Sequence, residues 1–168
     1  MLPNPNVIFA DERRCSIAAL LEPAQAVGGD YYDCFMLDAQ RLCVAIGDVS
    51  GKGVPASLFM AISKTLTGVL TRRQNDLGLA VRELECELSR ENSEYLFVTA
   101  FIAVLDLITG EMTYVCAGHD APVLQRAGAL FAAANKVRPQ PAHDQKSGMR
   151  IEHRTQSDEV GAHRLDQF

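Results

Sequence analysis

The sequence predicts an α+β fold, and the order of its apolar patterns carries that prediction. Runs with β character come first, two segments with helical spacing follow, and the chain returns to β character from about residue 95. Strands grouped on either side of two helices are typical of an antiparallel sheet with helices packed on it. The length of 168 residues suits a single domain with its own core.

The first strand group contains three apolar runs. They occupy residues 15–21, 30–37 and 42–48. The polar link DAQ between the second and third runs is short enough for a hairpin. We therefore expect residues 30–37 and 42–48 to pair antiparallel around a loop at 38–40.

Two helices are expected next. The segment GVPASLFMAISKTLTGVLTRR has an apolar residue at every fourth position, at Leu58, Ile62, Leu66 and Leu70. That spacing predicts the buried stripe of a helix. A second helix is expected at about 76–91, where Asn75 or Asp76 can cap it. Its apolar face comprises Leu77, Val81, Leu84 and Leu88.

The second strand group follows the helices. Residues 95–106 are rich in aromatic and branched side chains, and the turn LITGE connects them to a returning strand at 112–117. Residues 122–126 and 129–133 are expected to form a further hairpin around RAG. From Lys136 the chain has few large apolar residues and no clean period. We therefore predict a domain over residues 1–135 and an irregular tail over 136–168.

Composition and charge exclude several classes of function. With 16 basic and 21 acidic residues, the net charge of -5 lacks the basic surface of a nucleic-acid-binding protein and would not be attracted to an anionic membrane. No uninterrupted apolar run reaches the roughly 18 residues of a membrane span, and the N-terminus has no signal-peptide pattern. The five cysteines form no CxxC pair and mostly lie in apolar runs. We expect a cytoplasmic protein without nucleic-acid or membrane partners.

Two Gly-Asp steps stand at the ends of the predicted hairpin. With a three-residue loop at 38–40, Asp30 lies directly opposite Asp48 on the same face of the sheet, at a separation of roughly 4.5 to 5.5 Å. Two carboxylates that close repel each other unless a cation lies between them or one of them keeps its proton. Oxygen ligands of this kind suit hard cations such as magnesium or manganese.

The register decides whether this site exists. A two-residue loop would place the two carboxylates on opposite faces, and the Gly-Asp steps could equally mark two turns. The GKG at residues 51–53 is not a Walker A loop, because three residues instead of four separate Gly47 from Gly51. In addition, Gly53 stands where that loop requires Ser or Thr. We expect these glycines to permit close backbone approach and a sharp turn into the helix.

Three blocks of sequence, in this order, carry a family resemblance: PAQAVGGDYYD, IGDVSGKGVPASLFMA and FVTAFIAVLDLITGEMTYVCAGHDAPVL. Over residues 2–131 they resemble the metal-dependent serine/threonine protein phosphatases of the PPM type, in the bacterial branch typified by SpoIIE and RsbU. The resemblance implies an α-β-β-α sandwich of antiparallel strands that binds two Mn²⁺ or Mg²⁺ ions. It also implies hydrolysis of phosphoserine or phosphothreonine, usually on a phosphorylated anti-sigma-factor antagonist.

The resemblance further implies site residues. Asp30 matches the metal-binding aspartate of the first block, and Asp48 matches the aspartate that contacts both metals. These two would be the catalytic and metal-binding carboxylates, and Val49 would contribute its carbonyl oxygen. Two metals held in this way can clamp a phosphate, supply a deprotonated water and stabilise the leaving oxygen.

Other polar residues receive less specific interpretations. In the expected register Asp33 points to the opposite face of the sheet, so we expect a structural role. Lys52 could attract a phosphate, but a solvated lysine is expected at such a junction. His119, in AGHDAP, is expected to order its loop and not to bind metal. The tail contains three histidines whose spacing fits no metal site: His143, His153 and His163.

The resemblance ends near residue 135. The family continues with a segment of the type GD-L-LLYTDG-E, which brings the remaining metal-binding aspartates, and no TDG follows here. Either a shifted reading frame or a divergent tail would produce this pattern. We expect an incomplete sandwich whose activity is weak or absent. The alternative is a non-catalytic remnant that docks a partner or forms a homodimer through the helix at 54–73.

Overall fold

The computed structural model of the chain describes residues 3–22, 28–90, 92–120, 122–126, 129–132 and 146–153. Its elements, in chain order, are α1 (Pro5–Ile8), β1 (Cys15–Glu22), β2 (Tyr31–Met36), β3 (Arg41–Val49), α2 (Gly53–Arg73), α3 (Leu77–Arg90), β4 (Val98–Asp106), β5 (Met112–Ala117), β6 (Val123–Arg126), β7 (Ala129–Ala132) and β8 (Lys146–His153). The predicted order of strands, two helices and further strands is confirmed.

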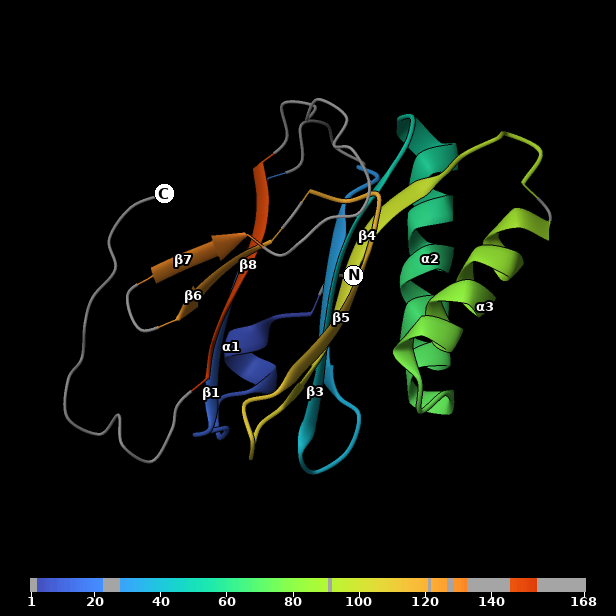
Figure 1. Cartoon of the computed structure of the whole chain (residues 1–168). Helices are drawn as coiled ribbons and strands as arrows, with labels where there is room; N and C mark the ends of the chain where they lie inside the picture. The colour runs from blue at the N-terminus through green and yellow to red at the C-terminus, as the bar shows by residue number, and fades with distance from the viewer. Residues whose placement is uncertain are drawn as a thin grey trace.

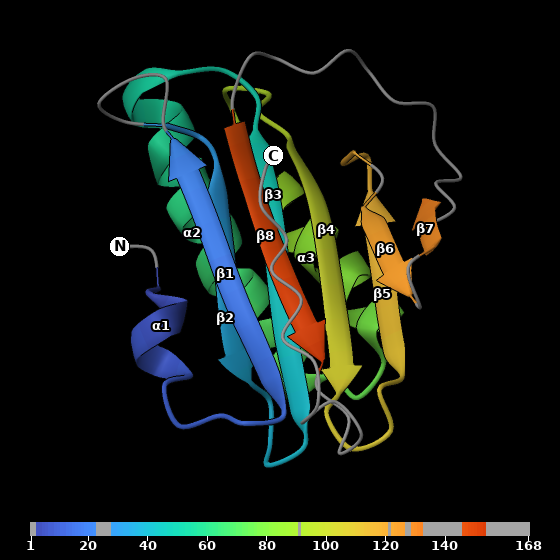
Figure 2. The ribbon, with the colours of Figure 1, turned by 90° about the vertical axis from the view of Figure 1, so that its left-hand side faces the viewer.

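Three layers make up the arrangement. The central layer is an antiparallel sheet in the order β2-β3-β4-β5. Helices α2 and α3 cover one of its faces, and the β1-β8 pair lies over the other (Figure 1). Viewed from the side of β1, the two-stranded layer lies in front of the sheet and the helices behind it (Figure 2). The α+β prediction with an antiparallel sheet is therefore confirmed.

The hairpin of β2 and β3 has the predicted loop and register. Tyr31 pairs with Gly47 at one end and Met36 with Leu42 at the other. Residues 38–40 form the loop, beyond the hydrogen bond that the Leu37 amide donates to the carbonyl of Arg41 at 2.8 Å.

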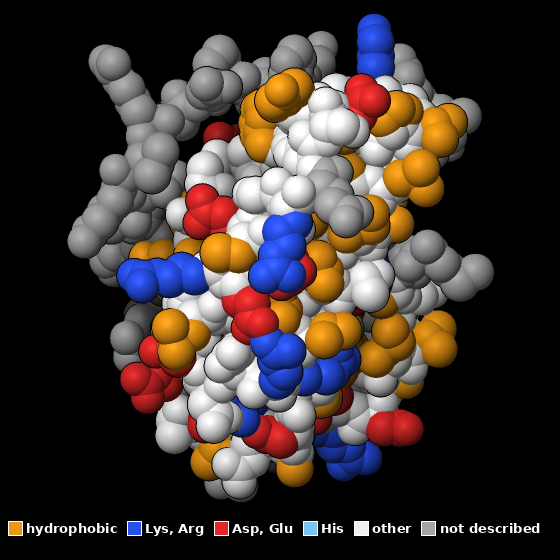
Figure 3. Space-filling view, turned by 90° about the vertical axis from the view of Figure 1, so that its right-hand side faces the viewer, with side chains coloured by type: hydrophobic (Ala, Val, Ile, Leu, Met, Phe, Trp, Pro, Cys, Tyr) orange, Lys and Arg blue, Asp and Glu red, His pale blue; other side chains and the backbone are white. Residues whose placement is uncertain are grey.

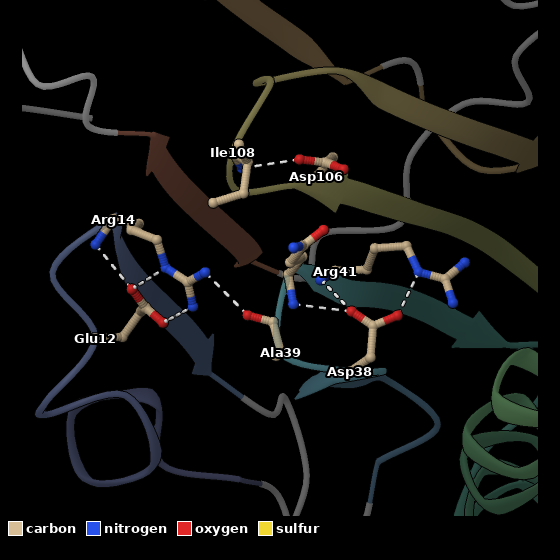
Figure 4. Close-up of polar contacts among 8 residues, drawn as sticks. Glu12, Arg14, Asp38, Ala39, Arg41, Asp106 and Ile108 are labelled. Carbon is tan, nitrogen blue, oxygen red and sulfur yellow. Dashed lines mark hydrogen bonds and ion pairs between the residues drawn. The ribbon is translucent and has the colours of Figure 1, made fainter.

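Asp38 organises the hairpin loop. Its Oδ1 accepts hydrogen bonds from the backbone amides of Gln40 and Arg41, each at 2.8 Å, and its Oδ2 contacts the Arg41 guanidinium at 2.6 Å (Figure 4). The two backbone amides and the Arg41 guanidinium lower the pKa of Asp38 to about 2. Arg14 reaches the same loop and donates to the carbonyl of Ala39 at 2.9 Å.

Alternation along the strands produces two separate cores. The side chains that face β1 form the first core: Cys34, Leu42, Val44, Phe101, Ala103 and Leu105, packed with Cys15 and Ile17. Their alternating neighbours Cys43, Ala45, Ala100 and Ile102 pack against the helices, with Leu70 of α2 and four residues of α3. Each side chain of the central sheet can therefore be assigned to a face by its position along the strand.

Helix α3 follows the predicted pattern. Leu77, Leu84 and Leu88 are buried against the sheet, and Val81 is partly buried beside them. The Asp76 carboxylate caps the helix by accepting the Leu79 amide at 2.9 Å. The amphipathic spacing was a reliable guide for this element.

The predicted buried stripe of α2 is wrong in its first half, whereas Leu66 and Leu70 pack on the core beneath the helices. Leu58 and Ile62 are 61% and 52% exposed, and only Leu70 of the predicted set is fully buried. The face that packs on the sheet consists mainly of small residues: Ala56, Ser63, Thr67, Gly68 and Thr71. Small side chains allow close approach of the helix to the sheet, so the larger apolar residues lie outside. Hydrophobic side chains are scattered over this helical surface (Figure 3).

Polar groups on the buried face of α2 are satisfied within the helix. The hydroxyls of Ser63, Thr67 and Thr71 donate to the carbonyls four residues earlier, at 2.7 to 2.8 Å. Burying these hydroxyls therefore leaves no unmade hydrogen bond. An assignment based only on apolar spacing cannot detect a face of this kind.

Helix α2 also passes a length and composition test for a membrane span. An 18-residue window within its 21 residues has a mean hydropathy of 1.3, although no such segment was expected from the sequence. The difference arises because that expectation required an uninterrupted apolar run, whereas an average tolerates interspersed Ser and Thr. The core helix of a soluble protein passes the same test, and α2 packs on β2, β3 and α3.

The expected irregular tail needs a correction at residues 146–153. These residues form β8, which pairs antiparallel with β1 along its whole length, for example Ile17 with Ile151 and Ala19 with Met149. The segment SGMRIEH alternates apolar and polar residues after its glycine, which is the period of a strand. Residues 133–145 and 154–168 lie outside the described part of the chain.

Candidate active site

The structure brings Asp30 and Asp48 together. Asp30 directly precedes β2, whose first residue Tyr31 pairs with Gly47, so the next position of the register sets Asp30 opposite Asp48. By strand alternation both carboxylates lie on the face that carries Cys34 and looks toward β1. Asp30 is only 5% exposed. The predicted juxtaposition of the two carboxylates is confirmed.

Asp30 has a strongly raised pKa. Burial disfavours its charged form, and hydrogen bonding and repulsion from the Asp48 carboxylate act in the same direction. Together they raise the pKa of Asp30 to about 7. Without a bound cation, the two carboxyl groups therefore hold a proton at pH values where an ordinary aspartate is ionised.

Close backbone approach shapes the entrance to the site. The Val49 amide donates to the carbonyl of Gly29 at 3.3 Å. A Cβ atom on Gly29 would lie 2.7 Å from the Val49 carbonyl oxygen, so only glycine fits beside it. The Gly29 backbone therefore packs directly against the carbonyl that the sequence analysis proposed as a ligand.

Two glycines turn the chain from β3 into α2. Gly51 and Gly53 have φ angles of 89° and 77°, a region that favours glycine. Lys52 lies between them as an exposed N-cap residue that makes no side-chain capping bond. Ser57 ties the turn to the opposite side of the site by donating to the carbonyls of Gly53 and Gly28, at 2.9 and 3.3 Å.

A third strand contributes Thr99 and, through the following turn, His119. Thr99 pairs with Asp48 in the β3-β4 register. Its Oγ1 lies 3.5 Å from the Asp48 carbonyl oxygen and 3.1 Å from Nδ1 of His119. Burial lowers the pKa of His119, while Asp120 and Asp48 oppose that shift. The sequence analysis singled out His119 but missed Thr99, whose position only the β3-β4 register reveals.

Asp33 lies on the other face of the sheet. Its carboxylate forms an ion pair with Lys64 of α2 at 3.0 Å, between side chains that are 13% and 23% exposed. The structural role expected of Asp33 fits this contact. Of the tail histidines, His153 is the last residue of β8, and His143 and His163 lie outside the described residues.

The donor set fits a hard divalent cation in kind. Carboxylate and carbonyl oxygens are the ligands that magnesium and manganese prefer, and a cation between Asp30 and Asp48 would remove the repulsion that raises the Asp30 pKa. The set is small, however. Within the described ranges, no three His, Cys, Asp or Glu side chains converge on a point where they could hold a metal.

Comparison with known proteins gives concordant results. Residues 38–149 match the sequence profile of the family "Stage II sporulation protein E (SpoIIE)". The protein IcfG of Synechocystis is 29% identical over 141 residues, which cover 68% of this chain and 22% of IcfG. The phosphoserine phosphatase RsbU of Bacillus subtilis is 31% identical over 109 residues, or 65% of this chain and 32% of RsbU. The chain thus spans about a third or less of these curated relatives.

Solved structures share the fold. The PP2C phosphatase domain of SpoIIE from Bacillus subtilis aligns with a TM-score of 0.65 and 19% identity, over 84% of this chain and 43% of that one. The RsbU and RsbW domains of Rv1364c from Mycobacterium tuberculosis align with a TM-score of 0.63 and 24% identity. This alignment covers 83% of this chain and 40% of that one. RsbX in complex with magnesium aligns with a TM-score of 0.55 and 18% identity, over 83% of this chain and 67% of that one.

Proposed function

This chain belongs to the SpoIIE family of PPM-type phosphatases, and from that premise we propose that it carries the metal-binding part of a serine/threonine phosphatase site. The substrate class is a protein phosphorylated on serine or threonine. A relative described as a phosphoserine phosphatase supports this assignment. The single observation that carries it is the register of β2 and β3, which sets Asp30 opposite Asp48.

Asp30 and Asp48 would hold the cation through their carboxylates, and Val49 through its carbonyl oxygen. When bound, Mn²⁺ or Mg²⁺ supplies Lewis-acid stabilisation of phosphate charge and activation of water. Magnesium bound to a protein of the same fold supports this choice of ion. The described residues offer fewer ligands than the six oxygens or so that such ions take. We therefore expect weak metal affinity and slow turnover.

The proposed biological substrate is a phosphorylated anti-sigma-factor antagonist in a bacterial switch. The resemblance to RsbU, and to a protein that joins RsbU and RsbW domains, supports a phosphoprotein partner of this type. A cytoplasmic location belongs to the same proposal. It is supported by two buried thiols, Cys34 and Cys43, which form no disulfide and suit a reducing compartment.

Phosphatase assays test the proposal. The purified chain is incubated with a phosphoserine peptide and millimolar Mn²⁺, and release of phosphate is compared with that of Asp48→Asn and Asp30→Asn. We expect slow, EDTA-sensitive hydrolysis by the unaltered chain and its loss in both variants. Asp11→Asn serves as the matched control, because Asp11 is exposed and lies outside the β2–β3 hairpin. Activity that survives Asp48→Asn would refute the proposed site.

A second candidate function is docking or homodimerisation through α2. The observation in its favour is a row of exposed apolar side chains on that helix: Val54, Leu58, Ile62 and Val69. Burial of such a row against a second copy would be favourable. Sedimentation velocity over a range of concentrations measures the state directly. A dimer that Ile62→Glu dissociates supports this candidate, and a monomer at every concentration rules out the homodimer.

A further inference from the structure

We infer that His119 is a positioning residue for the Asp30/Asp48 site and that it acts through Thr99. This inference rests on the proposed function, because it concerns how the described chain holds the end of β3 that would bind the cation. It assigns a role to a residue that the sequence analysis treated only as ordering its own loop.

Three adjacent strands align polar residues at one end of the sheet. Asp30 lies opposite Asp48 across β2 and β3, and Thr99 lies opposite Asp48 across β3 and β4. Thr99 alternates in step with Phe101, Ala103 and Leu105, which face β1. Its hydroxyl therefore lies on the same face as the two carboxylates. Three polar side chains thus form a row across adjacent strands at one end of the sheet.

The turn after β5 brings His119 to this row. Gly118 forms a parallel bridge with Ala100, the neighbour of Thr99. Its φ of 71° turns the chain there, and a Cβ at this position would meet the Thr99 side chain at 3.6 Å. The Cys116 thiol donates to the His119 carbonyl at 3.2 Å. The turn therefore runs beside Thr99, and the Cys116 contact holds the backbone of the residue that carries the imidazole.

The Thr99 hydroxyl links His119 to the Asp48 backbone. The Thr99 hydroxyl has one proton, and its contact with the Asp48 carbonyl oxygen at 3.5 Å uses it as a donor. The proposal assigns the Nδ1–H tautomer to His119, in which the imidazole donates to Oγ1 across the 3.1 Å contact. The chain of donors runs from His119 through Thr99 to the Asp48 backbone.

The hydrogen bond from Thr99 to the Asp48 carbonyl restrains the groups that would bind the metal. The Asp48 carbonyl belongs to the peptide that leads into Val49, so fixing it restrains both the Asp48 carboxylate and the following carbonyl. Groups that orient metal ligands from outside the coordination sphere typically contribute a factor of about 10 to 100 in metal affinity. We expect an effect of that size from the His119–Thr99 pair.

The test is binding of Mn²⁺ alone to the full chain, measured by electron paramagnetic resonance of the free ion. We expect His119→Ala and Thr99→Val each to weaken binding by about 10 to 100-fold. Because the two residues act in series, the double variant should be no weaker than either single one. Thr99→Ser, which keeps the hydroxyl, should bind within about threefold of the unaltered chain.

Two amide replacements of His119 test which of the two imidazole nitrogens is needed. The side-chain amide of His119→Asn places a donor near the position of Nδ1, so this variant should keep most of the Mn²⁺ affinity. The amide of His119→Gln lies near the position of Nε2 instead, so this variant should bind Mn²⁺ as weakly as His119→Ala. The inference would be overturned if His119→Ala bound Mn²⁺ as tightly as the unaltered chain. It would also be overturned if His119→Gln, and not His119→Asn, kept the Mn²⁺ affinity. Unfolding measured in EDTA checks that every variant folds, so that a loss of stability is not mistaken for a loss of ligand geometry.

Asp48→Asn distinguishes failure of this inference from failure of the proposed function. If Asp48→Asn abolishes Mn²⁺ binding while His119→Ala leaves it unchanged, the metal site stands and the role of His119 falls. If Asp48→Asn also leaves binding unchanged, or the unaltered chain binds no Mn²⁺ at millimolar concentration, both fall.

Discussion

Asp30 is buried beside a second carboxylate, and its pKa makes the stability of the metal-free protein depend on pH. The folded-state pKa of about 7 exceeds the ordinary value of 3.8. The folded state therefore binds the Asp30 proton more tightly than the unfolded state does. The stability that this proton contributes is fully present below about pH 4 and is lost as pH rises through 7. Urea unfolding in EDTA should show the loss between those pH values.

The matched comparison is Asp30→Asn, which cannot ionise at that position. We expect the free energy of unfolding of the unaltered chain to fall relative to that of Asp30→Asn as pH rises from 4 to 7. Added Mn²⁺ at pH 7 should stabilise the unaltered chain only, because ligand binding to the folded state raises its stability. Parallel pH profiles for the two proteins would show that Asp30 does not titrate in this range.

Gly47 is a residue at which packing allows no side chain. A Cβ there would lie 2.4 Å from the ring of Tyr31, which is fully buried and cannot move aside. We expect Gly47→Ala to lower the free energy of unfolding by about 1 to 3 kcal/mol. The penalty should shrink in a Tyr31→Leu background, as measured by a double-mutant cycle of urea unfolding. Additive effects would mean that the two positions are not in contact.

At this scale the sequence predicted the Asp30/Asp48 pair because a short loop and a strict two-residue alternation fix which residues oppose each other. Thr99 could not be found in the same way. It lies on a strand separated from Asp48 by two helices, and no local rule sets the register between segments so far apart. The role of His119 depends on Thr99 and was missed for the same reason.

Among the elements, α2 is the one in which apolar spacing and burial disagree. Substitutions can separate the two patterns. Leu58 lies on the exposed side, so Leu58→Gln should change the free energy of unfolding by no more than about 0.5 kcal/mol. Ser63 is fully buried, so Ser63→Leu should destabilise by about 1 to 3 kcal/mol through overpacking. Thermal or urea unfolding of both variants measures the difference.

The apolar stripe read from the sequence predicts the opposite order, with Leu58→Gln the more damaging change. That result would mean that α2 presents its other face to the sheet. Helix α3 offers the comparison, since Leu84 is both in phase with the apolar pattern and buried. The pattern succeeded for α3 because its buried face is made of leucines. It failed for α2 because small and hydroxyl side chains provide the contact.

For the whole molecule, β8 joins a late segment to β1, and the two strands form the layer over the Asp30/Asp48 face (Figure 2). Replacing Ile151, which pairs with Ile17, by proline removes a backbone donor and should disturb the ladder. We expect lower stability and faster hydrogen exchange of the β1 amides than in the unaltered chain. Unchanged exchange in β1 would mean that β8 does not pair there in solution.

The layered arrangement was within reach of the sequence, except for its last strand. The alternating residues of SGMRIEH are few, and their partner strand lies more than a hundred residues earlier. Such long-range pairing leaves only a weak local pattern, so the segment could not be distinguished from irregular chain. The match of the SpoIIE family profile extends into it, to residue 149.

The account as a whole depends on Asp30 holding a proton beside the Asp48 carboxylate, a proton that a divalent cation replaces. Calorimetric titration with Mn²⁺ at pH 6.5, in two buffers of different ionisation enthalpy, counts the protons released on binding. With a pKa of about 7, most of one proton should be released by the unaltered chain and none by Asp30→Asn. Binding without proton release, or equal release by both proteins, would contradict the account.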